Sequence, residues 1–98
     1  MKVIWSKLAK ESLAQIYDYI FEDSPQNAEM VFNTLFELGN SLSDEKVEYA
    51  KDLIINEERF RIIPKWSYKI IYERTESLVI ILDIFNTYRN PKRLGRYK

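Results

Sequence analysis

The stretch between residues 58 and 91 contains three runs rich in Ile, Val, Tyr and Phe, and it restricts the fold more than any other part of the sequence. Two short polar breaks, at residues 64–67 and 74–77, separate the runs. Runs of β-branched and aromatic residues between such breaks are typical of β-hairpins. The third run is apolar at every position from 78 to 82, as in a strand with neighbours on both sides and helices against it. The pattern predicts a meander of three antiparallel strands.

Side chains alternate between the two faces of a strand, and this rule places the cations of the first two runs. In the first run, Arg59 and Arg61 fall on one face, and Phe60 and Ile62 fall on the other. In the second run, Lys69 falls on the face opposite to the neighbouring tyrosines. We therefore expect cations to line up on one side of the sheet.

The N-terminal half predicts a strand followed by two helices. Lys2–Trp5 is a short β-prone run that we expect to join the meander as an edge strand. Ser6 is placed to cap a helix that begins near Lys7, and Ser24 followed by Pro25 is a typical start of a second helix. Apolar residues recur at helical spacing in both segments, so each helix has one face to bury. The sheet offers the large apolar surface that both helices need.

These elements define the expected fold, an α+β domain with the order β-α-α-β-β-β in which a helical hairpin packs on an antiparallel sheet. A chain of 98 residues suffices for one hydrophobic core, so we expect a single domain over residues 1–98. Residues 43–58 fit either a short helix or a loop that leads into a strand, and the sequence leaves both open.

The net charge of zero hides an uneven distribution of charged residues. Residues 1–58 hold 5 Lys and Arg against 12 Asp and Glu, a balance of −7. Residues 59–98 hold 10 against 3, a balance of +7. A cationic sheet on an acidic scaffold would attract phosphate groups or an acidic partner protein. The alternative is a dipolar pattern that serves only solubility.

The chain contains neither His nor Cys, so the usual acid–base, nucleophilic and metal-binding constellations are not expected, and we expect no metal and no cofactor. With two glycines there is no Gly-rich phosphate loop. No apolar run approaches the roughly 20 residues of a membrane span. The N-terminus lacks the apolar core of a signal peptide, so we expect a cytoplasmic protein without a membrane partner. Arg, Lys and Tyr remain, and they bind phosphates and stabilise developing negative charge.

Three segments carry a resemblance to a known family. The segment Tyr68–Tyr72, the apolar strand after it, and Asn-Thr-Tyr-Arg-Asn-Pro at 86–91 resemble the core of the RelE/ParE superfamily of bacterial toxins. With the helices included, the resemblance covers about nine tenths of the chain. It implies the toxin of a type II toxin–antitoxin system, a growth-arresting protein of the kind that stabilises plasmids. A cognate antitoxin would neutralise it in a hetero-oligomer.

The two branches of the superfamily imply different targets. RelE-like members cleave mRNA on the ribosome, whereas ParE-like members act on DNA gyrase without nuclease chemistry, so the resemblance leaves open whether the chain is an enzyme. Four features favour the ParE branch: the Ser24-Pro25 junction, the long helical hairpin, the segment Asn-Thr-Tyr-Arg-Asn-Pro at 86–91, and a charge low for a ribosome binder. An interpretation from another class is a non-toxic binding module whose basic sheet face docks an acidic partner.

RelE-like members carry cations on the second strand, on the third strand after its first Tyr, and beyond the last strand, and often a C-terminal Tyr. By this resemblance the candidate catalytic residues are Arg61, Lys69, Arg89 and Tyr97. The candidates for binding nucleic acid or another target are Arg59, Arg61, Lys69, Tyr88, Arg89 and Arg93. The chain departs from the pattern at Lys69, where many members have Arg, and at Gly95, which falls about where the C-terminal Tyr is expected. Alternatively, Arg59 and Arg61 belong to the solvated face of an edge strand.

Overall fold

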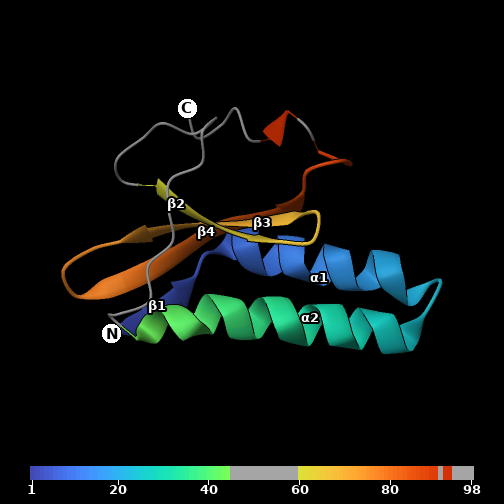
Figure 1. The fold of residues 1–98 in the computed structure, drawn as a ribbon, viewed down its shortest axis with the longest axis horizontal. Coiled ribbons are helices and arrows are strands. Elements are labelled where there is room, and N and C mark those ends of the chain that lie inside the picture. The colour runs from blue at the N-terminus through green and yellow to red at the C-terminus, as the bar shows by residue number, and fades with distance from the viewer. Residues whose placement is uncertain (45–59, 91, 94–98) are drawn as a thin grey trace.

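The computed structural model describes residues 1–44, 60–90 and 92–93, and Figure 1 shows the arrangement of its elements. The order confirms the predicted α+β class, with a strand, two helices and three further strands. The elements are β1 (Lys2–Trp5), α1 (Lys7–Phe21), α2 (Pro25–Asn40), the 3-10 turn η1 (Ser41–Ser43), β2 (Phe60–Lys65), β3 (Tyr68–Arg74) and β4 (Leu78–Asn86). The sequence leaves residues 43–58 open between a short helix and a loop. Of these, residues 45–58 lie outside the described part of the chain, so that choice stays open.

The four strands form one sheet in the order β1-β4-β3-β2, which places β1 and β2 at its edges. The meander pairs β2 with β3 and β3 with β4 in antiparallel fashion, as predicted. β1 instead runs parallel to β4, from Lys2 opposite Leu78 to Trp5 opposite Ile81, so the sheet is mixed and not wholly antiparallel. A parallel pair needs a long crossover, and the helical hairpin forms part of the chain between these strands. A β-prone run of four residues does not specify the direction in which it pairs.

Both helices begin at the serines that the sequence predicts. The Ser6 hydroxyl accepts the amide N–H of Ala9 at 3.0 Å, and the Ser24 hydroxyl accepts that of Asn27 at 3.2 Å. Such caps typically stabilise a helix by about 1 kcal/mol. Ser6 also donates its hydroxyl to the carbonyl of Leu82 at 2.8 Å, so the same residue that starts α1 fastens it to β4.

The main core lies between the sheet and the two helices, which cover the same face of the sheet (Figure 1). Its fully buried members from the helices and η1 are Ala9, Leu35 and Leu42, and those from the strands are Ile70, Tyr72, Val79, Ile81 and Ile84. A second, smaller cluster of Phe60, Ile62, Ile71 and Phe85 belongs to the other face. The sheet therefore buries apolar residues on both faces, which explains why β4 reads as a continuous apolar run.

A β-bulge interrupts the pairing of β4 with β3. Ile71 lies opposite Asp83 while Tyr72 lies opposite Ile81, so Leu82 is an extra residue without a partner in this register. β1 ends opposite Ile81, and within the described ranges no strand pairs with β4 beyond that residue on this side. The bulge and the open edge coincide, and the candidate site is built there.

Candidate functional site

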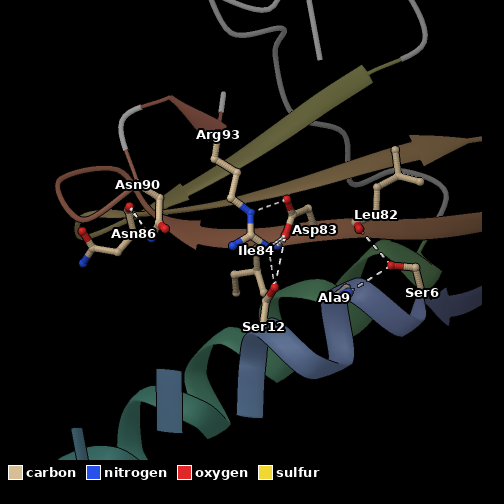
Figure 2. A network of polar contacts seen from close by, with 9 residues as sticks. All are labelled: Ser6, Ala9, Ser12, Leu82, Asp83, Ile84, Asn86, Asn90 and Arg93. Carbon is tan, nitrogen blue, oxygen red and sulfur yellow. Dashed lines mark hydrogen bonds and ion pairs between the residues drawn. The ribbon is translucent and has the colours of Figure 1, made fainter. Parts of the chain in front are cut away.

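Asp83 is the centre of a polar network at the open edge of β4 (Figure 2). Its carboxylate is fully buried. Oδ1 accepts hydrogen bonds from the amide N–H of Ile84 at 2.8 Å and from Arg93 Nη2 at 2.7 Å. Oδ2 accepts a hydrogen bond from Arg93 Nε at 2.9 Å. A buried carboxylate requires such pairing, because an unpaired charge in the interior is strongly unfavourable.

Arg93 connects three separate segments of the chain. Besides its two bonds to Asp83, its Nη2 donates to the hydroxyl of Ser12 on α1 at 2.6 Å (Figure 2). The Arg93 side chain is only 17% exposed. The network therefore holds the segment after β4 against both the sheet and the first helix. Arg93 is a predicted target-binding residue, and the structure gives its guanidinium an internal role, so its contact with a target stays a prediction.

Asn86 organises the turn that follows β4. Its Oδ1 accepts the amide N–H groups of Tyr88 at 2.9 Å and Arg89 at 3.1 Å, and its backbone carbonyl accepts that of Asn90 at 2.9 Å. Its Nδ2 donates to the hydroxyl of Ser67 at 2.9 Å. The Asn-Thr-Tyr-Arg-Asn sequence thus sets the backbone conformation that presents Tyr88 and Arg89.

Arg89 lies on the helical side of this turn. Its guanidinium carbon is 3.9 Å from the ring centroid of Tyr19 on α1, a cation–π contact between two exposed side chains. Tyr88 points into solvent and is 85% exposed. Both residues remain accessible to a target.

The expected alignment of cations on one side of the sheet is wrong for Arg61 and Lys69, the two of these cations that the structure describes. The hairpin register pairs Arg61 with Tyr72 and Ile62 with Ile71, and it pairs Pro64 with Lys69. Arg61 therefore belongs to the face of the main core, and Lys69 belongs to the face of the smaller cluster. The faces of two strands can be related only when their register is known. Arg59 and Tyr97 lie outside the described residues, so their predicted roles stay predictions.

Two hollows flank these elements. A polar hollow of about 180 Å³ is bounded by Ser12, Gln15, Asn86 and Arg89. A larger apolar groove of about 670 Å³ runs between the edge strand β1 and both helices. Stacked rings form part of its wall, because Phe36 lies 5.4 Å from Trp5 and 6.0 Å from Phe32 between ring centroids. Lys2 and Lys10 also line the groove, and both are exposed.

Sequence reasoning missed Ser12, Asp83 and Trp66. Asp83 gave a signal, since an acidic residue inside an apolar strand must find a partner if it is buried. No local sequence pattern identified Arg93 as the partner of Asp83 or placed Ser12 beside Arg93. Trp66 is 56% exposed in the β2–β3 turn. The hairpin prediction included it only as part of the polar break at residues 64–67.

Within residues 1–44, 60–90 and 92–93, no group of three or more His, Cys, Asp or Glu side chains is arranged to hold a metal ion. Across the same residues, no helix has the length and apolar character needed to cross a bilayer.

Comparison with known proteins agrees with the fold and adds a match to a protein family. Residues 3–91 match the family model described as the ParE toxin of the type II toxin–antitoxin system parDE. No curated protein matches. Among solved structures, the chain resembles one titled as the chromosomal ParDE toxin–antitoxin system from P. aeruginosa, with a TM-score of 0.72 and 19% sequence identity. The match covers 88% of this chain and 95% of the other, and it shows that the two chains share a fold.

Proposed function

The chain belongs to the ParE toxin family of type II toxin–antitoxin systems, and we propose that it arrests growth by inhibiting DNA gyrase without cleaving RNA. As a member of that family, it is the toxin of a pair and has a cognate antitoxin. Both gyrase and ribosomes are reached from the cytoplasm, which we propose as its compartment. The match to the ParE family is the first support for gyrase as the target.

The observation that carries the proposal is the separation of the predicted catalytic cations. A nuclease must gather its charged groups around one scissile phosphate, because stabilisation of the transition state depends on their position. Arg61 and Lys69, two of the predicted catalytic cations, belong to opposite faces of the sheet. Arg93, predicted only as a binding residue, is engaged by buried Asp83. Arg89 remains at the surface but lies against Tyr19 on the helical side. This arrangement favours a toxin that acts by binding.

Induction of the toxin in growing cells, with pulse labelling of DNA, RNA and protein, tests the proposal. A gyrase inhibitor should first reduce DNA synthesis and induce DNA-damage signalling and filamentation, while protein synthesis continues. An early fall in protein synthesis with cleaved mRNA would instead identify a ribosome-dependent nuclease. Normal growth under verified expression of folded protein would favour the non-toxic binding module.

We also propose that the antitoxin occupies the apolar groove between β1 and the two helices. A peptide with apolar anchors would cover rings such as Phe36, which is 42% exposed. Lys2 and Lys10 line the groove and would pair with acidic residues of the antitoxin. The groove also adjoins an edge strand, where an extended segment can add main-chain hydrogen bonds. The predicted contact of acidic antitoxin residues with Arg59, Arg61 and Arg89 stays a second, separate part of the proposal.

A further inference from the structure

Trp66 occupies a backbone position that disfavours it. It is the first residue of the two-residue turn between β2 and β3, and its φ is 52°. Among the described residues it is the one non-glycine residue with a positive φ. This region favours Gly because a β-carbon crowds the backbone there. The side chain is 56% exposed, so the strain is not offset by full burial of the ring. Fold stability alone gives no reason for a Trp at this position.

A second exposed aromatic residue is fixed close to this turn. The carbonyl of Ser67 accepts the amide N–H of Thr87 at 2.9 Å and its hydroxyl at 3.0 Å. Trp66 directly precedes Ser67, and Tyr88 directly follows Thr87. The β2–β3 turn and the turn after β4 therefore lie at the same end of the sheet, as Figure 1 also shows. The two rings are presented from backbone segments that these bonds hold together.

Two cations belong to the same turns as these rings, and one of them contacts Trp66 itself. Lys65 Nζ lies 4.8 Å from the ring centroid of Trp66, and Arg89 follows Tyr88 in the chain and lies over Tyr19. Neither Lys65 nor Arg89 forms an ion pair with a carboxylate in the described part of the chain. Their positive charges are therefore not neutralised by an ion pair there. We call Lys65, Trp66, Tyr88 and Arg89 the aromatic tip.

We propose that the aromatic tip binds single-stranded nucleic acid, with bases stacked on Trp66 and Tyr88 and phosphates beside Lys65 and Arg89. Exposed aromatic faces next to cations are the elements that bind single strands without sequence preference. A duplex hides its base faces inside the stack and cannot use the rings in this way. A protein partner would need carboxylates as well as an apolar surface at this spot, whereas a single strand supplies negative charge and flat apolar faces at every nucleotide. The proposal goes beyond gyrase inhibition, because such binding requires neither gyrase nor the antitoxin.

The test uses the full chain, separated from its antitoxin, and a fluorescently labelled 12-nucleotide strand as DNA and as RNA of the same sequence. Anisotropy measures binding at low salt, and a blunt duplex of the same sequence is the comparison. Stacking should also quench the emission of exposed Trp66, while the buried Trp5 contributes a constant background. We expect saturable binding of a single strand and at least about ten-fold weaker binding of the duplex. The DNA and RNA arms show which strand is preferred.

Trp66→Gly separates binding from folding. Glycine accepts the positive φ, so the melting temperature should stay the same or rise. Loss of a base-stacking ring should nevertheless weaken binding about ten-fold or more. Phe21→Ala is the matched control, because Phe21 is 47% exposed on the helical hairpin, outside the tip. This variant should bind the strand like the unmodified chain.

The salt dependence tests the cations. The association constant K falls as salt rises. Each of Lys65→Ala and Arg89→Ala should make the slope of log K against log salt less steep by about 0.7, the value for one phosphate contact on a single strand. Lys7→Ala removes a highly exposed cation at the far end of α1 and should leave the slope unchanged. The proposal is overturned if neither strand binds at low salt, if the duplex binds as well, or if Trp66→Gly binds normally. A further outcome is that the unmodified chain binds no strand while Trp66→Gly loses gyrase inhibition. This result would assign the aromatic tip to a protein contact and would also overturn the proposal.

Discussion

Arg93 forms a bidentate ion pair with the fully buried Asp83, with Nη2 2.7 Å from Oδ1 and Nε 2.9 Å from Oδ2. Asp83 lies two residues beyond Ile81, the residue of β4 that is opposite the end of β1. Since the Arg93 guanidinium also reaches Ser12, one side chain connects the segment after β4 with the sheet and α1. The turn that carries Tyr88 and Arg89 lies between Asp83 and Arg93 in the chain. The position of the exposed candidate residues thus depends on a buried contact.

The first prediction concerns this ion pair. Arg93→Ala removes the Arg93 ion pair from the buried carboxylate of Asp83, which should lower the free energy of unfolding by about 3 to 5 kcal/mol. Asp83→Ala should cost less, because the long Arg93 side chain can turn its guanidinium into solvent. The double variant should lose less than the sum of the two single losses. Denaturant unfolding measures all three. A loss below about 1 kcal/mol in Arg93→Ala would show that Asp83 is solvated or paired elsewhere.

The second prediction concerns Gly39 in the last turn of α2. A β-carbon there would lie 2.4 Å from Cζ2 of Trp5, whose indole N–H is held by Asn40 Oδ1 at 3.0 Å. Gly→Ala normally stabilises a helix by about 1 kcal/mol, but overpacking in a core costs about 1 to 3 kcal/mol. We expect Gly39→Ala to lower the melting temperature. Asn33→Ala, at an exposed site of the same helix, should raise it slightly, and a rise in both variants would mean that Trp5 can move aside.

The third prediction concerns the antitoxin groove. Ala14 is exposed and lines the groove, so Ala14→Arg should block it without disturbing the core. We expect at least a roughly ten-fold loss of antitoxin affinity, a loss of about 1.4 kcal/mol, and failure of the antitoxin to rescue growth. Isothermal titration with the purified antitoxin measures the change. Gln26→Arg on the exposed surface at the start of α2 is the control. Normal affinity in Ala14→Arg would move the antitoxin to another surface.

The fourth prediction concerns Arg89, which is predicted to contact the target and lies at the surface over Tyr19. Arg89→Ala should reduce toxicity roughly ten- to thousand-fold, the range of a central interface arginine. The free energy of unfolding should fall by only about 0.5 to 1 kcal/mol, the contribution of an exposed cation–π contact. Growth assays and denaturant unfolding of the same variant test the separation. Full toxicity would remove Arg89 from the target-binding surface, and global unfolding would make it structural.

Local signals in the sequence were sufficient for the helix starts and for the meander. Ser6 and Ser24 cap their helices through groups three residues away, and the two hairpin breaks are short. Local signals did not predict how segments that are distant in the sequence pair with one another. The direction of β1 depends on which edge it joins, and the faces of Arg61 and Lys69 depend on a pairing register. The partner of Asp83 lies ten residues away, beyond a turn whose path the sequence pattern does not specify.

A supercoiling assay with purified DNA gyrase and the purified toxin measures gyrase inhibition directly. We predict that the toxin blocks supercoiling of relaxed plasmid DNA and that the antitoxin restores it. The same preparation should leave mRNA intact in a reconstituted translation reaction. Unimpaired supercoiling together with ribosome-dependent mRNA cleavage would rule out gyrase as the target, and it would show that the dispersed cations assemble into a nuclease site.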